Sequence, residues 1–257
     1  MTFSRAITRI PGANFAKGLT SSRELPPDVG LAVAQHARYC DALRSCGLEV
    51  RTLDPDLQHP DSTFVEDTAI VTERVAVVTC PGASSRLGET RAMALVIQEY
   101  YANVRRITAP GTLDGGDVCQ IENHFLIGLS GRTNAAGAAQ LAAILQEHDY
   151  TADVVDIRGL AALLHLKSGL AFLGDRRLLL VEGLPIADRL GAFELVEVPV
   201  AEAYAANCVR INERVLVPEG YPVTAAKLRR LGYDLLPLEV SEFRKMDGGL
   251  SCLSLRF

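Results

Sequence analysis

Groups that can carry nucleophilic chemistry stand at five separated places in this sequence. In chain order they are Glu66 with Asp67, Asp114 with Asp117, His165, Asn207 with Cys208, and Cys252. A thiol, an imidazole that moves protons and a carboxylate that orients the imidazole are the parts of a cysteine nucleophile site. These parts can work together only if the fold brings all five places to one hollow.

The elements around these places repeat one pattern: two strands joined by a short turn, then a helix, then a third strand. The clearest unit has strands at 65–72 and 75–80, a helix at 89–101 and a strand at 104–108. A second has strands at 118–121 and 125–129, a helix at 133–148 and a strand at 153–157. The five places lie where the first strand of each unit begins, so we expect them to face one central space.

Two further units and the chain ends complete the pattern. The third has strands at 169–173, 178–182 and 193–198, with its helix reduced to a turn or two. The fourth has strands at 208–211, 215–217 and 234–240 and a helix at 224–231. A strand at 251–257 is expected to pair with 3–10, followed by a helix at 28–46 and a strand at 48–53. The chain ends thereby close a ring and remove exposed sheet edges.

The sequence therefore predicts an α/β fold that forms a single domain over residues 1–257. A doubly wound parallel sheet also alternates helices with strands. Its parallel neighbours need helical crossovers, however, whereas short hairpins make antiparallel neighbours. No glycine-rich phosphate loop follows a strand, since Gly115 and Gly116 precede a hairpin.

The alternation of side chains along strands selects among the candidate residues. In a strand at 250–257, Cys252 lies on the face opposite the apolar residues at 253, 255 and 257. Around 163–167, the same alternation separates His165 and Lys167 from Leu164 and Leu166. We therefore favour Cys252 and His165 as the reacting pair, and Cys208 is the rival nucleophile.

The remaining histidines and cysteines are interpreted as structural. His36 and His148 on helices, His59 before Pro60 and His124 in a turn are expected at the solvated surface. Cys40 and Cys46 are helical, and Cys80 and Cys119 fill strands. The six cysteines include no C-x-x-C pair, which argues against a zinc knuckle and a disulfide scaffold.

Composition narrows the class of partner. The 257 residues are 48% hydrophobic and 22% charged, which is enough apolar material for a packed core. A net charge of -5 argues against nucleic acid or anionic lipid as a partner and favours a small molecule. No apolar run approaches the roughly 20 residues that span a bilayer. We expect a soluble, unexported, cytoplasmic protein.

Five segments closely resemble the dimethylarginine dimethylaminohydrolase family. They are DSTFVED at 61–67, GTLDGGDV at 111–118, RTN at 132–134, LHLKSG at 164–169 and DGGLSCLS at 247–254. They are correctly ordered and span nearly the whole chain. The family belongs to the pentein, or guanidino-group modifying, superfamily, and the resemblance implies a fivefold pseudosymmetric α/β propeller, in agreement with the repeat.

The resemblance also implies roles for particular residues. Cys252 is the nucleophile, His165 the general acid/base and Asp114 the carboxylate that supports His165. Position 114 is Glu in many members of the wider superfamily, and Asp117 is the fallback partner. The substrate-binding set contains Asp67 and Glu66 on the guanidinium, Phe64 packed on the substrate, Arg86 and Arg132 on the α-carboxylate, Asp61 and Leu19 on the α-amino group, and Met246. Residues 18–22 resemble the mobile lid.

The activity implied is hydrolysis of N-methylated arginines to citrulline through a covalent thiouronium, with no cofactor or metal. An arginine or agmatine deiminase would use the same groups, and an amidinotransferase similar ones. A binding module without catalysis is the alternative from another class. A homodimer, common among the relatives, is expected by analogy.

Overall fold

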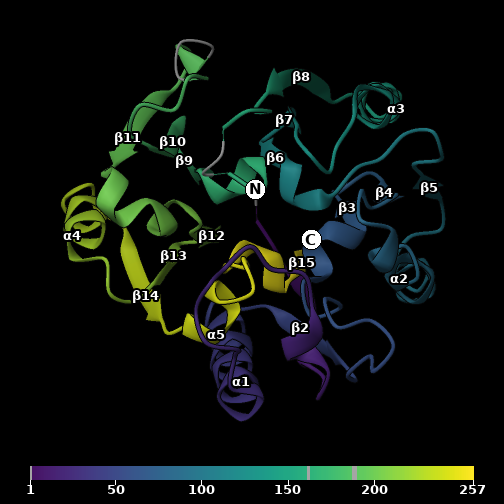
Figure 1. Ribbon diagram of the computed structural model, residues 1–257. Coiled ribbons are helices and arrows are strands. Elements are labelled where there is room, and N and C mark those ends of the chain that lie inside the picture. Colours follow the sequence, from purple (N-terminus) through teal and green to yellow (C-terminus); the bar gives the residue numbers. More distant parts are fainter. Residues whose placement is uncertain (1, 161–162, 187–189) are drawn as a thin grey trace.

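Five small sheets surround a central axis in the computed structural model, which describes residues 2–160, 163–186 and 190–257. Figure 1 shows the sheets as a ring, with the longer helices outside them and both chain ends near the middle. Each sheet has three strands, of which the central one is antiparallel to one neighbour and parallel to the other. This is the predicted fivefold α/β propeller. Within the described ranges, no helix is both long and apolar enough to cross a membrane.

The two chain ends share one sheet, as predicted. Its strands and helix are β15 (Leu255–Arg256), β1 (Arg5–Arg9), α1 (Val29–Ser45) and β2 (Glu49–Leu53). β1 pairs antiparallel with β15 and parallel with β2. α1 begins after Asp28, whose carboxylate accepts a hydrogen bond from the amide of Leu31 and caps the helix. Pairing of the first and last strands closes the ring.

The other four sheets follow the predicted order. Counted from the sheet of the chain ends, the second unit contains β3 (Ala69–Val71), β4 (Ala76–Val78), α2 (Glu89–Gln98) and β5 (Val104–Arg106). The third contains β6 (Val118–Ile121), β7 (His124–Leu129), α3 (Ala135–Gln146) and β8 (Thr151–Asp156). The fourth contains β9 (Leu170–Gly174), β10 (Arg177–Val181) and β11 (Glu194–Val198). The fifth contains β12 (Val209–Ile211), β13 (Arg214–Pro218), α4 (Pro222–Arg230) and β14 (Asp234–Leu238), and α5 (Ser241–Arg244) follows. The short helix predicted after β10 falls partly on residues 187–189, outside the described residues.

A turn of 3-10 helix precedes the first strand of every sheet, and the sequence did not predict it. These turns are Val65–Thr68, Gly115–Asp117, Leu166–Ser168, Val200–Ala206 and Ser251–Leu253. The strands predicted at 65–72 and 251–257 are therefore wrong over their first residues. A 3-10 helix repeats every three residues, so the two-residue alternation does not apply to Cys252, and it does not continue past His165, which immediately precedes the Leu166–Ser168 turn.

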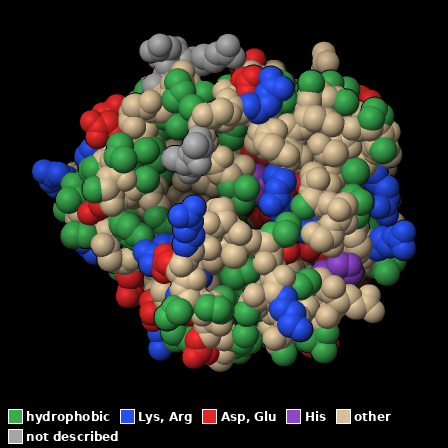
Figure 2. Space-filling view, viewed as in Figure 1, with side chains coloured by type: hydrophobic (Ala, Val, Ile, Leu, Met, Phe, Trp, Pro, Cys, Tyr) green, Lys and Arg blue, Asp and Glu red, His purple; other side chains and the backbone are tan. Residues whose placement is uncertain are grey.

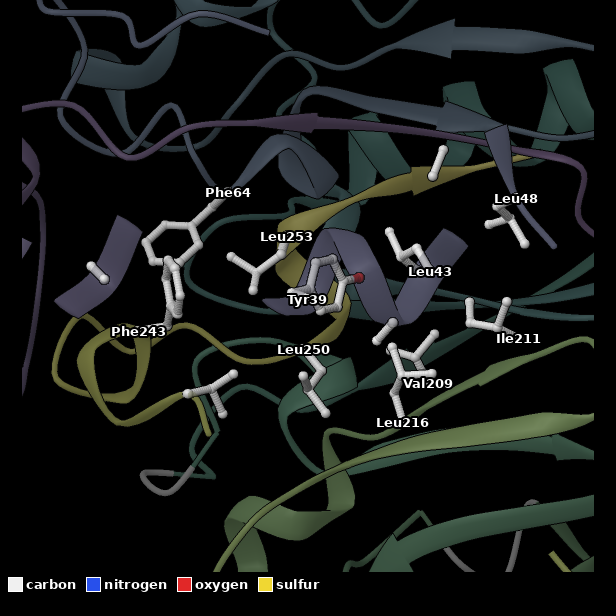
Figure 3. Close-up of a cluster of buried hydrophobic side chains, with 14 of the residues drawn as sticks. Tyr39, Leu43, Leu48, Phe64, Val209, Ile211, Leu216, Phe243, Leu250 and Leu253 are labelled. Carbon is white, nitrogen blue, oxygen red and sulfur yellow. The ribbon is translucent and has the colours of Figure 1, made fainter. Parts of the chain in front are cut away.

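The apolar core is divided among the spaces between sheets and helices. Figure 3 shows one cluster, in which Tyr39 and Leu43 of α1 lie beside Leu250, Leu253 and the strand residue Val209. The hydroxyl of Tyr39 lies 2.6 Å from Ser254 Oγ, so its polar end is satisfied inside the core. The turn that carries Cys252 is thus packed against α1.

Two of the histidine predictions need correction. His36 is buried, and its ring lies 3.7 Å from the sulfur of Cys40, which in turn lies 3.5 Å from the hydroxyl of Thr8 in β1. Burial, with a smaller contribution from Arg44, lowers the pKa of His36 to about 4. His124 lies in β7 rather than in the preceding turn, which is made by Glu122 with a φ of 56°.

Candidate active site

A small hollow of about 30 Å³ lies beside the turns Val65–Thr68 and Ser251–Leu253, each of which contributes one lining residue. Figure 2 shows a depression near the middle of the ring, with acidic, basic and histidine side chains inside it. The hollow is lined by Leu19, Asp61, Phe64, Asp67, Arg86, Arg132, Leu164, His165, Met246, Asp247, Gly248 and Cys252. The catalytic and substrate-binding residues implied by the family resemblance are all in this set except Asp114 and Glu66. The other candidates, Asp117, Asn207 and Cys208, do not line the hollow, so the expectation that all five places face one space is wrong for them.

Asp114 lies directly behind His165. The Nε2 atom of His165 is 3.2 Å from Asp114 Oδ2, and both side chains are almost fully buried. The other oxygen of Asp114 accepts a hydrogen bond from the amide of Gly82 at 2.8 Å, which fixes the carboxylate. The side chain of Asp114, which is one methylene shorter than the Glu found at this position in many members of the wider superfamily, therefore reaches the imidazole.

Asp117 has different partners. Its Oδ2 accepts hydrogen bonds from the hydroxyls of Ser130 and Thr133 at 2.6 and 2.7 Å. Its Oδ1 accepts from the amide of Leu166 at 3.0 Å. Asp117 thus holds the turn that follows His165, and Asp114 is the carboxylate that contacts the ring.

The electrostatic surroundings of His165 favour its cation. Burial alone would lower its pKa, but the carboxylate of Asp67, the hydrogen bond that His165 donates to Asp114 and the charge of Asp117 together raise the pKa to about 9. The other ring nitrogen, Nδ1, lies against Gly116, where a Cβ would be only 2.6 Å away. His165 is therefore held as an imidazolium in a space that requires glycine at position 116.

Cys252 is carried by the Ser251–Leu253 turn. Its amide donates to the carbonyl of Gly249, and Asn207 clamps Ser251 by accepting from its amide at 2.9 Å and donating to its hydroxyl at 3.1 Å. Burial, followed by the negative charges of Glu66 and Asp67, raises the pKa of the Cys252 thiol to about 12. A cation bound in the hollow would favour the thiolate.

Asp67 offers a carboxylate to the hollow. Burial would raise its pKa, but His165 and Arg86 outweigh it and lower the pKa to about 2. Its Oδ1 accepts from the amide of Gly116 at 2.8 Å, and its Oδ2 accepts from Arg86. Asp67 is therefore ionised across the neutral pH range and available to a cationic substrate.

The two arginines of the hollow differ in their environment. Arg86 is buried, and its guanidinium donates to Asp67, to Glu89 and to the carbonyls of Phe64 and Asp61. Arg132 is 20% exposed, and its guanidinium makes one long contact of 3.5 Å with Asp114. Arg132 is thus the better placed of the two to receive a carboxylate.

The segment at 18–22 covers one side of the hollow. The amide of Leu19 donates to Asp61 at 3.0 Å, and the Ser21 hydroxyl donates to Asp247 at 3.1 Å. A Cβ at Gly18 would lie 2.4 Å from the Asp61 carboxylate, so this close approach requires glycine. Small-molecule sites measure about 300–1,000 Å³, so a substrate must displace part of this cover.

Phe64 and Met246 form the apolar wall of the hollow. The ring of Phe64 lies 5.9 Å from that of Phe15 and 6.3 Å from that of Phe243, centroid to centroid. Both Phe64 and Met246 belong to the buried cluster around α1. This packing places an aromatic face beside the hollow.

Glu66 lines a second, larger cavity instead of the hollow. Its carboxylate accepts from Lys167 at 2.6 Å, from the Ser251 hydroxyl at 2.8 Å and from Arg256 at 3.3 Å. Lys167 was predicted to share a face with His165, but it belongs to the next turn and faces this second cavity. The rival nucleophile Cys208 also lines the larger cavity, where burial raises the pKa of its thiol to about 12.

Several residues of the site lacked a predicted role. Leu164 and Asp247 line the hollow beside residues of the recognised motifs, and Asn207, noted for its place before a strand, clamps the nucleophile turn.

Asp67, Asp114 and His165 could each offer one atom to a metal ion, since these atoms lie within 4.8 Å of one another. Arg86 and Arg132 already contact two of these carboxylates and neutralise part of their charge.

Known relatives match nearly the whole of this chain. The family model of arginine deiminase matches residues 57–199. The chain is 45% identical to the N(G),N(G)-dimethylarginine dimethylaminohydrolase of Pseudomonas aeruginosa, over 99% of this chain and 100% of that protein. It is 36% identical to the enzyme of the same name from Streptomyces coelicolor, over 100% of this chain and 98% of that one.

Solved structures agree. A Cys-to-Ser mutant of the Pseudomonas aeruginosa enzyme, complexed with citrulline, superposes with a TM-score of 0.97 at 44% identity over the full length of both chains. The N-terminal domain of ArgZ, a cyanobacterial arginine dihydrolase, has the same fold, with a TM-score of 0.87 at 18% identity over 100% of this chain and 97% of that one.

Five sheets around one axis, with a thiol, an imidazole and carboxylates at their meeting point, define a hydrolase of the pentein class. The resemblance seen in the sequence motifs extends over the whole chain and the whole fold. This chain belongs to the dimethylarginine dimethylaminohydrolase family.

Proposed function

We propose that this protein hydrolyses asymmetric dimethylarginine and monomethylarginine to citrulline, releasing dimethylamine or methylamine. The observation that carries the proposal is a hollow in which Cys252 stands with His165 and an ionised Asp67. Relatives of the same family are named for this reaction, and one of them has been solved with citrulline.

Substrate recognition rests on charge. The carboxylate of Asp67 receives N–H groups of the planar guanidinium, since a carboxylate is an acceptor that matches such an edge. Arg132 receives the α-carboxylate, and Asp61 with the backbone of Leu19 receives the α-amino group. Phe64 and Met246 border the substrate. Arg86 acts mainly by holding Asp67 in place, and Glu66 contributes negative charge from behind.

The first half of the reaction forms the covalent intermediate. The bound guanidinium lowers the pKa of Cys252, so the thiol loses its proton to solvent and the thiolate attacks the central guanidinium carbon; the thiolate takes a proton back from solvent after the product has formed. A C–S bond forms and the resulting tetrahedral adduct collapses. His165, held as an imidazolium by Asp114, gives its proton to the alkylated nitrogen, and dimethylamine leaves as the C–N bond breaks. A thiouronium on Cys252 remains.

The second half releases the product. His165, now neutral, takes a proton from water as the water oxygen attacks the thiouronium carbon. The tetrahedral adduct expels the Cys252 thiolate, and the ureido group of citrulline forms. The remaining proton of the water passes to solvent, where the released amine is protonated. Atoms and charge then balance as substrate cation plus water giving citrulline plus dimethylammonium.

One experiment tests the proposal. Purified protein is incubated separately with asymmetric dimethylarginine, monomethylarginine, arginine and agmatine, and citrulline is measured together with dimethylamine, methylamine or ammonia. We expect stoichiometric citrulline and alkylamine from the methylated substrates only. Comparable release of ammonia from arginine would assign the protein as a deiminase instead, and absence of turnover with all four would contradict an enzyme of this class.

Three further properties remain our proposals. Residues 1–257 form one catalytic domain, because no single sheet contains the whole site. The protein is expected to be cytoplasmic and to form a homodimer. Size-exclusion chromatography with light scattering tests the last of these, and a monomeric mass at micromolar concentration would contradict it.

A further inference from the structure

A second cavity, of about 250 Å³, lies behind the hollow. The two cavities share no lining residue within the described ranges. Consecutive residues of two turns divide between them: Glu66 and Ser251 line the larger cavity, whereas Asp67 and Cys252 line the hollow. The larger cavity therefore surrounds the same axis without using the proposed catalytic groups.

The inner end of this cavity carries more positive than negative charge. Lys167 Nζ and Arg256 Nη2 lie 2.6 and 3.3 Å from the same oxygen, Oε1 of Glu66. The other oxygen of Glu66 accepts from the hydroxyl of Ser251. Two cations thus share one carboxylate, and all three charged side chains are at most 16% exposed.

These cations retain hydrogen-bond donors. Among the described residues, the ammonium of Lys167 contacts only Glu66, although an ammonium has three N–H groups. Arg256 directs Nη1 to Ser251 and Ser254, and its Nε has no partner in the same part of the chain. In the part of the chain that the structure describes, only Asn14 Oδ1 and Tyr233 Oη are fully buried without a partner, so the Nε of Arg256 reaches the space of the cavity, where an entering acceptor group can take the place of water.

The walls and the rim define the rest of the ligand. Apolar side chains of the first strands, including Ala69, Val118, Leu170 and Ala171, line the walls and suit a short hydrocarbon chain. The rim contains two carboxylates, Glu122 and Asp175, and one cation, Arg210. The Nη1 atom of Arg210 lies 3.4 Å from Asp175 Oδ2. The rim therefore disfavours a second negative charge.

We propose that this cavity binds a small aliphatic carboxylate. The carboxylate contacts Lys167 and Arg256, the chain lies along the apolar walls, and an uncharged or cationic end reaches the rim. This site is distinct from the one proposed for methylated arginines and does not depend on that function.

Calorimetric titration tests the proposal with butanoate, 4-aminobutanoate, succinate and 1-butanol as probes. Excess citrulline is present to cover the Arg132 side of the hollow, and each titration is repeated without it. We expect saturable binding of butanoate and 4-aminobutanoate, at least about tenfold weaker binding of succinate and butanol, and little change when citrulline is omitted. Equal affinity for butanoate and butanol, or no saturable binding, would overturn the proposal.

Variants locate the binding. Arg256→Gln is expected to weaken butanoate binding about tenfold or more, because a charge-assisted contact is lost. Ala171→Leu narrows the cavity without changing its charge and should also weaken butanoate binding, whereas Arg210→Gln at the rim is the matched control and should retain it. Thermal unfolding confirms that each variant is folded. Unchanged affinity in folded Arg256→Gln protein would contradict the assignment.

Crystals soaked in 4,4,4-trifluorobutanoate give a direct check. Density beside Lys167 and Arg256, together with binding in solution, supports the proposal. Density only in the hollow or only on the outer surface overturns it. Since no readout here requires turnover, loss of this site and loss of the proposed enzymatic function are separately observable.

Discussion

Glu66 and Asp67 are adjacent in the chain, yet their carboxylates line different cavities. Asp67 faces the hollow with Cys252, and Glu66 faces Lys167 and Arg256 on the other side. The 3-10 turn at Val65–Thr68 causes this division, because it directs consecutive side chains to different sides of the axis. Both charges nevertheless act on the thiol of Cys252.

Removing the nucleophile should abolish turnover without loss of the fold. We expect Cys252→Ser to lower kcat by at least about a thousandfold, since the covalent route is lost. Cys208→Ser is the matched control: its thiol lies in the other cavity and should be dispensable. Steady-state citrulline formation and thermal unfolding measure both effects. Near-normal turnover by Cys252→Ser would show that the nucleophile is elsewhere.

The two aspartates near His165 should have separable effects. Asp114→Asn removes a carboxylate that raises the pKa of His165, so the pKa falls from about 9. Because His165 must be protonated to act as the acid, the loss of activity on the alkaline side should begin at a lower pH in this variant than in the unmodified protein. We also expect kcat to fall about 100-fold or more. Asp117→Asn should mainly lower thermal stability, because Asp117 holds the turn. Profiles of kcat against pH distinguish them, and identical alkaline limbs in Asp114→Asn and unmodified protein would refute this role.

Gly116 is expected to be required for the position of His165. A Cβ at this residue would lie 2.6 Å from Nδ1 of the ring, so Gly116→Ala must shift the imidazole. Misplacement of a catalytic group by about 1 Å can cost roughly 100-fold in rate. At Gly131 a Cβ meets nothing within 4 Å, and Gly131→Ala is the control. Equal kcat values for the two variants would contradict the steric argument.

Arg132 and Arg86 should respond differently to substitution. Arg132→Gln should raise KM for monomethylarginine about tenfold or more, and change KM much less for N-methylagmatine, which has no α-carboxylate. Arg86→Gln should destabilise the fold by about 3–5 kcal/mol, because Asp67 and Glu89 would be left buried without their cation. Kinetics and urea unfolding provide the two readouts. A large rise in KM for Arg86→Gln protein that is as stable as the unmodified protein would show that Arg86 binds the substrate directly.

His36 should make stability depend on pH. Its pKa is about 4 in the folded protein and about 6.5 when unfolded, so the unfolded chain binds more protons as pH falls below 6.5. The contribution to stability is present above pH 6.5 and is progressively lost toward pH 4, by about 3 kcal/mol. Urea unfolding of unmodified and His36→Gln protein at pH 7.5 and 4.5 measures the difference. A fall in stability of the same size in both would show that other groups account for it; His148→Gln is the control.

Much of the fold could be predicted because its pattern is local. Short hairpins, helices and return strands alternate in the sequence, and the predicted pairing of 3–10 with 251–257 is realised by β1 and β15. The motifs also named most of the residues that line the hollow, and they named Asp114, which contacts His165. These features depend on neighbouring residues or on whole recognised segments.

Tertiary structure decided how those residues face one another. Strand alternation could not reveal the turn that follows His165 or the turn that carries Cys252, because these turns are held by distant groups such as Asp117 and Asn207. It likewise could not show that Arg86 is enclosed by Asp67 and Glu89. The sequence by itself determined the repeated units and the chemical groups. Their directions were decided only where the five turns converge, because each direction there depends on hydrogen bonds and charges supplied by another unit.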